Sequence, residues 1–140
     1  MSVLNDAARA AISSANLAHL VTLNADGSPQ LSAVWVGMDG DDVVSGHMGD
    51  RQKLRNVRRD PRVAFSMQTG VVNAMGLAEY LVVRGTGQVV EGDAAALLQR
   101  LAHVHIGPDA KFPPGENHPM GLILRITPER VSGIGPWANT

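Results

Sequence analysis

The chain has 140 residues, and its 12 Lys and Arg nearly balance its 13 Asp and Glu, giving a formal net charge of -1 at pH 7. This length suits one domain that buries a core of its own, and the balanced charge argues against nucleic acid as the main partner, because nucleic-acid-binding domains usually carry a basic excess. The chain has no cysteine, which excludes disulfides and thiolate metal sites.

The start of the chain does not resemble a targeting segment. Residues 1–15 include Asp6 and Arg9 and lack a basic start followed by an apolar run. Elsewhere no stretch approaches the roughly 18 uninterrupted apolar residues that a membrane span needs. We therefore expect a cytoplasmic protein without a membrane partner, with residues 1–140 forming a single domain.

The first third of the chain shows one helical pattern followed by three β patterns. In residues 1–15 the apolar residues recur at the three- and four-residue spacing of one helix face. Residues 18–24 and 29–37 are β-rich runs separated by an Asp-Gly pair at residues 26–27, which is typical of a hairpin. A second turn leads into residues 43–48, so the three runs predict an antiparallel meander.

The middle of the chain continues the β pattern. Residues 62–68 predict a fourth strand, and residues 79–91 predict a long strand that follows a loose connection. Gly85 and Gly87 lie inside this long strand, where glycine is typical of a bulge or a sharp bend. Such a bend would allow the sheet to curl into a barrel.

The last third of the chain adds a helix, an irregular loop and a final β segment. Asp93 is a suitable N-cap for a helix of about three turns that ends near residue 107. Four prolines within residues 108–119 predict a surface loop. Residues 121–135 resume the β pattern, with Thr127-Pro128 expected to interrupt it. We therefore predict a mainly β (α+β) fold, a six- to seven-stranded antiparallel barrel with peripheral helices.

A dense basic segment follows the third β run, since residues 51–61 carry five of the 12 Lys and Arg residues. The pattern predicts a helix over residues 51–59, with Asp50 as N-cap and with Leu54 and Val57 facing inward. Cations at a helix start repel the helix dipole unless an anion is bound there. The segment therefore favours a phosphate-binding site. The alternative is a solvated helix face with weak surface ion pairs.

Few other residues indicate chemistry. The sequence shows no arrangement of nucleophile, base and acid, and no paired carboxylates typical of hydrolysis. This absence suits a redox enzyme whose cofactor supplies the chemistry. We assign no catalytic residue from the sequence. His103, His105 and His118 lack acidic or cysteine neighbours at ligand spacing, so we expect no metal site. His47 precedes the basic segment, so either a contact with cofactor or a structural hydrogen bond fits it.

Three segments in this order, DGSPQLSAVWV, RQKLRNVRRDPRVAF and RITPERVSGIGPW, cover much of the chain. Together they resemble the pyridoxamine 5'-phosphate oxidase-like (FMN-binding) split β-barrel superfamily, specifically its actinobacterial branch that depends on the deazaflavin coenzyme F420. The resemblance implies a homodimer with two cofactor sites at the subunit interface. It also implies that the partner subunit adds residues 75–80 to each site.

The resemblance further implies a set of cofactor-binding residues: Ser32, Ala33, Val34, Trp35, Ser45, Gly46, Arg51, Lys53, Arg55 and Trp137. Those of the second and third β runs would lie beside the ring of the cofactor. The three cations would bind the phosphate and the acidic tail of F420, since each charge-assisted contact needs its own donor. Trp137 would dock on its own barrel or over the site of the partner.

One departure from the family pattern bears on the cofactor. Flavin-binding oxidases of the superfamily carry an Arg and a Lys where this chain has Ser32 and Gly37, so F420 is expected and FMN is the second choice. The implied function is an F420H2-dependent reductase that transfers a hydride to a small conjugated or hydrophobic acceptor. The alternatives are an FMN-binding oxidoreductase of the same fold and a non-catalytic F420-binding protein.

Overall fold

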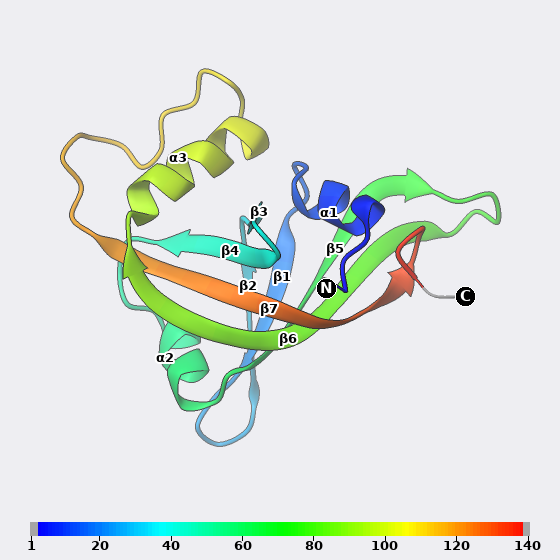
Figure 1. The fold of residues 1–140 in the computed structure, drawn as a ribbon, viewed down its shortest axis with the longest axis horizontal. Helices are drawn as coiled ribbons and strands as arrows, with labels where there is room; N and C mark the ends of the chain where they lie inside the picture. The colour runs from blue at the N-terminus through cyan, green and yellow to red at the C-terminus, as the bar shows by residue number, and fades with distance from the viewer. Residues whose placement is uncertain (1–2, 139–140) are drawn as a thin grey trace.

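The computed structural model describes residues 3–138, which form an antiparallel sheet and three helices (Figure 1). The helices are α1 (Asp6–Ile12), α2 (Gln52–Arg59) and α3 (Ala94–His105). The strands are β1 (Ala18–Leu23), β2 (Pro29–Val34), β3 (Gly37–Asp39), β4 (Asp42–His47), β5 (Arg62–Val72), β6 (Ala78–Gly92) and β7 (Gly121–Ile134). Their order in the seven-stranded sheet is β2-β1-β5-β6-β7-β4-β3. The predicted mainly β fold with peripheral helices is confirmed.

The order of the strands shows why the sheet curls. β2 and β3 form its two opposite edges, yet only Trp35 and Val36 separate them along the chain. A link of two residues spans at most about 10 Å. The two edges must therefore approach each other, which gives the curled sheet of a split barrel.

The predicted three-stranded meander is wrong. The run at residues 29–37 divides into β2, which pairs with β1, and the start of β3, which pairs with β4. The second neighbour of β4 is β7, about eighty residues further along the chain, where Val43 lies opposite Ile126. The sequence pattern identified these strands, but it holds no information on such distant partners.

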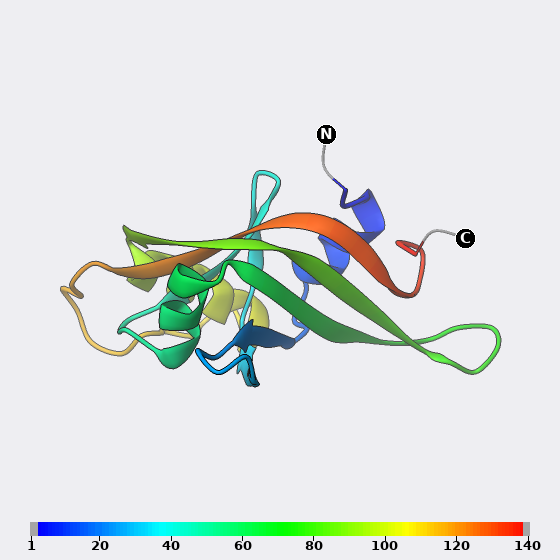
Figure 2. The same cartoon turned by 90° about the horizontal axis from the view of Figure 1, so that it is seen from below.

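β6 and β7 form a long, bent pair that supports the barrel (Figures 1 and 2). The register shifts between Arg84, which lies opposite Arg130, and Gly85, which lies opposite Pro128. A side chain at Gly85 would collide with the carbonyl group of Thr127, so the bend requires glycine. The predicted irregularity at Gly85 is confirmed, whereas the predicted break at Thr127-Pro128 is wrong, because the bulge carries β7 past the proline.

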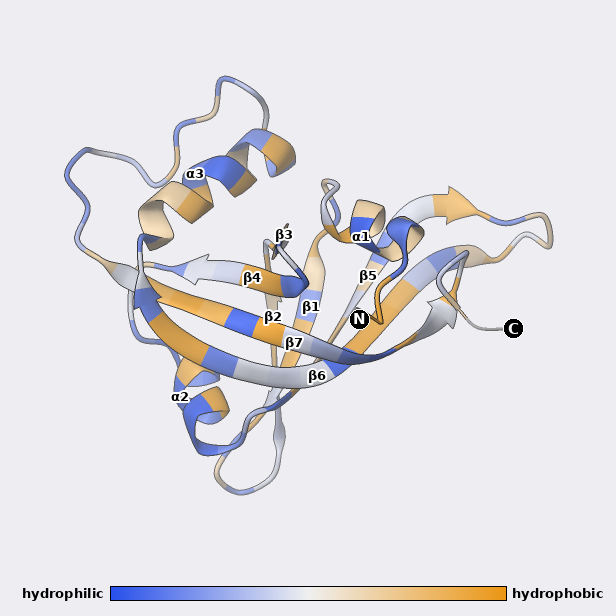
Figure 3. Cartoon of the chain, in the orientation of Figure 1, coloured by the Kyte–Doolittle hydropathy of each residue, from blue (hydrophilic) through white to orange (hydrophobic). Residues whose placement is uncertain are grey.

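The core lies inside the curled sheet and is closed by residues of the helices. Figure 3 shows polar residues interrupting the apolar ones along β6 and β7, as expected of strands with one buried face. Leu54 and Val57 of α2 are buried, which confirms their predicted inward direction. The largest buried side chains of the sheet are Leu20, Phe65, Met67, Leu81, Leu124 and Ile126.

The helix starts are only partly as predicted. Asp93 caps α3, with its carboxylate accepting a hydrogen bond of 3.0 Å from the Ala96 N–H, which confirms the prediction. Asp50 does not cap α2, because the N-cap is Arg51, which makes no side-chain capping bond. The Asp50 carboxylate instead pairs with Arg58 at 3.4 Å. The competing ion pairs explain why the prediction for Asp50 is wrong.

β5 and β6 extend beyond the barrel as a hairpin arm, with a tip at residues 73–77 that projects from the body (Figures 1 and 2). The arm carries several exposed apolar side chains: Val71, Val72, Met75 and Leu77. Within residues 3–138, no helix has the length and apolar character that a bilayer crossing requires.

Candidate functional site

A cleft of about 240 Å³ opens where β2, β4, α2 and α3 approach one another. In Figure 1, α2 and α3 lie on opposite sides of the sheet near the end of β4. The structure brings five of the predicted residues together in this cleft. Its lining is Leu17, Ala33, Val34, Trp35, Gly46, His47, Lys53, Leu98 and Phe112.

The absence of a side chain at Gly46 determines how closely α3 approaches the cleft. A Cβ atom at Gly46 would lie 3.1 Å from the Ala94 carbonyl oxygen and 3.2 Å from Leu98 Cγ. α3 therefore packs directly on the backbone of β4 and places Leu98 on the cleft wall. Gly46 is required for this packing whether or not it contacts a ligand.

His47 supplies a polar but uncharged group to the cleft. Its side chain is 9% exposed, and its Nε2 lies 2.8 Å from the Ser45 hydroxyl. Burial lowers the pKa of His47 to about 4, and the nearby charges of Lys53 and Arg51 contribute to this shift. The imidazole is therefore neutral at pH 7. Both roles considered for His47 fit, since it makes a structural hydrogen bond and also lines the cleft.

Lys53 is the cation that faces the cleft. Burial lowers the pKa of its ammonium group, and the charge of Arg51 lowers it further. Among residues 3–138, Lys53 forms no salt bridge, and α2 has no acidic residue in its first turn. A partly buried ammonium near the positive end of a helix dipole is unfavourable unless an anion offsets it. The cleft is therefore suited to an anionic group beside Lys53.

The other two predicted cations do not line the cleft. Arg51 is exposed at the start of α2, where its charge acts on Lys53 and His47. Arg55 is exposed and engaged, with its guanidinium 3.5 Å from the Asp50 carboxylate and 3.1 Å from the Gln52 side-chain oxygen. The alternative of a solvated face with weak ion pairs therefore describes Arg55 in this chain.

Three further predicted residues lie outside the lining. Ser45 is buried beneath the cleft, where it contacts His47. The hydroxyl of Ser32 is buried and has no hydrogen-bond partner. Trp137 packs in the core of its own chain, and its Nε1 donates a bond of 3.1 Å to the Tyr80 carbonyl oxygen. Docking on its own barrel is thus confirmed for Trp137, and a contact with cofactor in a partner's site stays a prediction.

Comparison with known proteins identifies the family. The model of the family described as pyridoxamine 5'-phosphate oxidase matches residues 4–135. The chain belongs to this family. The matched residues include the whole sheet and the three helices of the described chain. The match confirms the resemblance seen in the sequence.

Solved structures of the same fold include proteins with different stated functions. An F420 reductase is 29% identical, with a TM-score of 0.71, and the match covers 89% of this chain and 94% of the other. A conserved hypothetical protein of Mycobacterium tuberculosis is 22% identical, with a TM-score of 0.70 and coverage of 93% and 84%. A heme binding protein of Mycobacterium smegmatis is 26% identical, with a TM-score of 0.61 and coverage of 94% and 55%. No curated protein matches the sequence significantly.

Sequence reasoning named Trp35 but missed the aromatic residues that pack on it, His105 and Phe112. The ring of Trp35 stacks on His105, with centroids 5.3 Å apart and an interplanar angle of 7°. Phe112 meets Trp35 edge-on at the same centroid distance and an angle of 66°. One signal was available, because Phe112 is one of only two phenylalanines and stands in a polar, proline-rich loop.

Sequence reasoning also missed Asn56, which holds α2 in place. Asn56 is fully buried, and its Nδ2 donates to Thr22 Oγ1 at 3.1 Å and to Asn24 Oδ1 at 2.9 Å. Its Oδ1 accepts a bond of 2.8 Å from Gln52 Nε2. The network joins α2 to β1 and thereby fixes the position of Lys53. An asparagine inside a basic segment gave no sign of this role.

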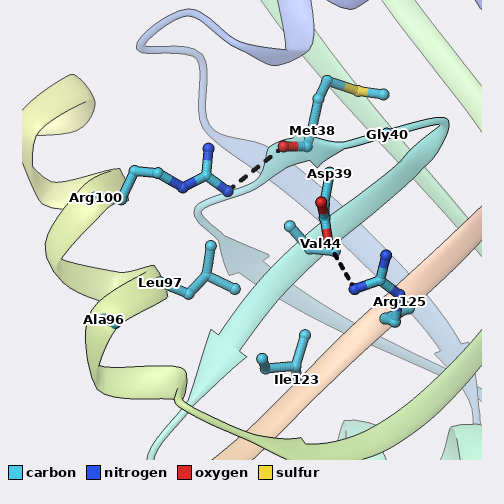
Figure 4. A pocket seen from close by; sticks show the side chains of 9 residues that line it. All are labelled: Met38, Asp39, Gly40, Val44, Ala96, Leu97, Arg100, Ile123 and Arg125. Atoms are coloured by element: carbon cyan, nitrogen blue, oxygen red, sulfur yellow. Dashed lines mark hydrogen bonds and ion pairs between the residues drawn. The ribbon is translucent and has the colours of Figure 1, made fainter.

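A larger cavity of about 520 Å³ lies on the other flank of α3, against β3, β4 and β7 (Figure 4). Its Arg125 is neutralised by Asp39 at 2.8 Å and Asp42 at 3.2 Å. Arg100 donates a long bond of 3.4 Å to the Met38 carbonyl oxygen. None of the predicted site residues lines this cavity. Its Arg125 is paired and its Arg100 is exposed, so among residues 3–138 the cavity offers no partly buried, unpaired cation like Lys53. Among residues 3–138 no cluster of three or more acidic or histidine side chains is placed to hold a metal.

Proposed function

We propose that the chain is an F420H2-dependent oxidoreductase that reduces a small conjugated or hydrophobic acceptor. The observation that carries the proposal is the partly buried ammonium of Lys53, which has no ionic partner among residues 3–138 and lies on the wall of a largely apolar cleft. The likeness to an F420 reductase over most of both chains supports the same choice. When bound, F420H2 supplies a hydride, and the protein supplies binding and orientation.

The residues of the cleft fit an elongated cofactor with a flat ring and an anionic end. Lys53 would bind the anionic end, with Arg51 adding charge at the rim and Arg55 available to the acidic tail in exchange for Asp50. Ala33 and Val34 would form an apolar wall for the ring. His47, neutral at pH 7, would offer a hydrogen-bonding nitrogen without adding charge near the ring.

The packing at Gly37 supports F420 over FMN. A Cβ atom at this position would lie only 2.8 Å from Leu101 Cδ2. A lysine, which flavin-binding oxidases of the superfamily carry here, would therefore require the Leu101 side chain to shift. The neutral side chain of Ser32 likewise replaces the arginine of those oxidases.

A second copy of the chain would complete the site. The cleft is open and holds about 240 Å³, less than the 300 to 1,000 Å³ typical of a site for a drug-sized ligand. F420 is larger than such ligands, so one chain alone encloses only part of it. In the proposed homodimer, residues 75–80 of the partner's hairpin arm would cover the remainder, while Trp137, packed in its own core, would support the arm through its bond to Tyr80.

The proposal is tested by titrating purified protein into F420 and, separately, into FMN, with fluorescence polarisation as the readout. We expect micromolar or tighter binding of F420 and weaker binding of FMN. Tight FMN binding without F420 binding would contradict the proposal and favour an FMN-dependent oxidoreductase. F420 binding without hydride transfer to enone or quinone acceptors would indicate a non-catalytic F420-binding protein.

A further inference from the structure

Two hydrogen bonds of the side chain of Gln99 in α3 hold the loop between α3 and β7. Gln99 Nε2 donates a bond of 2.7 Å to the Ala110 carbonyl oxygen, and Gln99 Oε1 accepts one of 3.1 Å from the Phe112 N–H. The amide thus pairs with the loop backbone on both sides of Lys111, as a neighbouring peptide group in a sheet would do. Gln99 Nε2 also lies 3.0 Å from His103 Nε2.

These hydrogen bonds of Gln99 place Phe112 at the edge of the cleft. The ring of Phe112 meets Trp35 edge-on, and the opposite contact of Trp35 is the stack on His105. Burial lowers the pKa of His105, which keeps this stack uncharged at neutral pH. Phe112 is nevertheless 37% exposed, so it buries too little surface to serve mainly as a core residue.

The two sides of the cleft differ in chemistry. Lys53 comes from α2 on one side, whereas Leu98 and Phe112 come from α3 and the loop that follows it on the other. The second side is apolar and aromatic, and its free surface is bounded by the rings of Trp35 and Phe112. The whole cleft holds only about 240 Å³, so the part between these two rings has room for a small acceptor only.

From this geometry we infer that Phe112 is a specificity-determining residue that selects flat, conjugated acceptors and rejects branched ones. Gln99 is a positioning residue that acts by holding Phe112 in place. The inference rests on the proposed function in taking this ligand to be the hydride acceptor. The shape selection itself is a property of the apolar wall and can be measured without F420.

The test compares the binding of two uncharged quinones by equilibrium dialysis without cofactor. Menadione is flat, and di-tert-butylbenzoquinone carries branched groups above and below the ring plane. The absence of cysteine prevents thiol addition to either quinone. The variants are Phe112→Ala and Gln99→Leu. The control is His103→Ala, because His103 contacts the side-chain amide of Gln99 but not the loop backbone.

We expect the native protein to bind menadione more tightly than di-tert-butylbenzoquinone. Loss of the aromatic contact in Phe112→Ala should lower this preference about three- to tenfold. Gln99→Leu should lower it in the same direction by a smaller factor, and His103→Ala should leave it unchanged. The affinity for F420 should change less than about twofold in every variant, because the contacts of its anionic end lie on the Lys53 side.

Three results would overturn the inference. The first is an unchanged quinone preference in Phe112→Ala, and the second is no binding of menadione to the native protein. The third is a fall in F420 affinity that parallels the fall in menadione affinity, since the wall would then serve the cofactor ring. Shape selection by a protein that binds no F420 would instead refute the proposed function and leave the role of Phe112 standing.

Discussion

The two polar residues that line the cleft owe their properties to their surroundings. His47 and Lys53 are both partly or fully removed from water, and each has its pKa lowered first by burial and then by nearby positive charge. His47 is neutral at pH 7, whereas Lys53 is a cation without an ionic partner among the described residues. This pairing gives the cleft one hydrogen-bonding group and one charge for an anionic ligand.

The buried state of His47 predicts a pH dependence of stability. The pKa of His47 falls from 6.5 in the unfolded chain to about 4 in the folded one, so the unfolded chain binds more protons between these values. The free energy of unfolding should therefore fall as the pH falls from 6.5 to 4, by up to about 3 kcal/mol.

Urea denaturation at several pH values between 4 and 7 measures this effect. His47→Gln removes the titration while keeping a partner for the Ser45 hydroxyl, so its stability should depend less on pH in this window. His103→Gln, at an exposed site, is the control. Equal pH dependence of the His47→Gln variant and the native protein would contradict the account.

Among the elements, α2 carries the cation and depends on an internal anchor. The helix contributes only Leu54 and Val57 to the apolar core, and the fully buried Asn56 joins it to Thr22 and Asn24 near the end of β1. Because β1 lies next to β2 in the sheet, this network connects the position of Lys53 to the strand that forms the apolar wall.

Removal of the anchor should destabilise the protein. Asn56→Leu leaves the buried Thr22 hydroxyl and the Asn24 amide without their partner, with an expected loss of about 2 to 3 kcal/mol in the free energy of unfolding. Arg58→Ala, which removes an exposed ion pair on the same helix, should cost less than about 1 kcal/mol. Chemical denaturation measures both, and equal midpoints would refute the role of Asn56.

The sequence predicted local features of the elements better than their contacts. Asp93 correctly predicted the start of α3, because a capping bond joins residues only three positions apart and is therefore visible in the local sequence. The pairing of β4 with β7 joins residues such as Val43 and Ile126, and no local pattern encodes it. Three of the predicted residues of the second strand line one cleft with Lys53, whereas Phe112, which the loop adds to its lining, was not predicted.

At the scale of the whole molecule, exposed apolar side chains lie on the hairpin arm and on an edge strand of the sheet. The hairpin arm exposes apolar side chains at its outer end, including Met75 at 82% and Val72 at 61%. Leu31, on the edge strand β2 next to the cleft residues, is 62% exposed. Exposed apolar residues that gather on projecting elements favour a protein interface.

We predict that the protein sediments as a dimer at micromolar concentration. Met75→Asp should shift it toward the monomer, because a buried interface disfavours an unpaired charge. Met120→Asp, at another exposed methionine, which lies in the loop before β7, should leave the dimer intact. A native protein that sediments as a monomer would contradict the shared site.

The most direct test of the account is the dissociation constant of F420 for Lys53→Ala, measured beside the native protein and Arg130→Ala. Arg130 is an exposed cation of β7 that does not line the cleft. Loss of a charge-assisted contact should weaken F420 binding about tenfold or more in Lys53→Ala, and more than it weakens binding of an analogue without the acidic tail. Arg130→Ala should bind F420 as the native protein does. Equal F420 affinity in all three proteins would show that the cation in the cleft does not hold the cofactor.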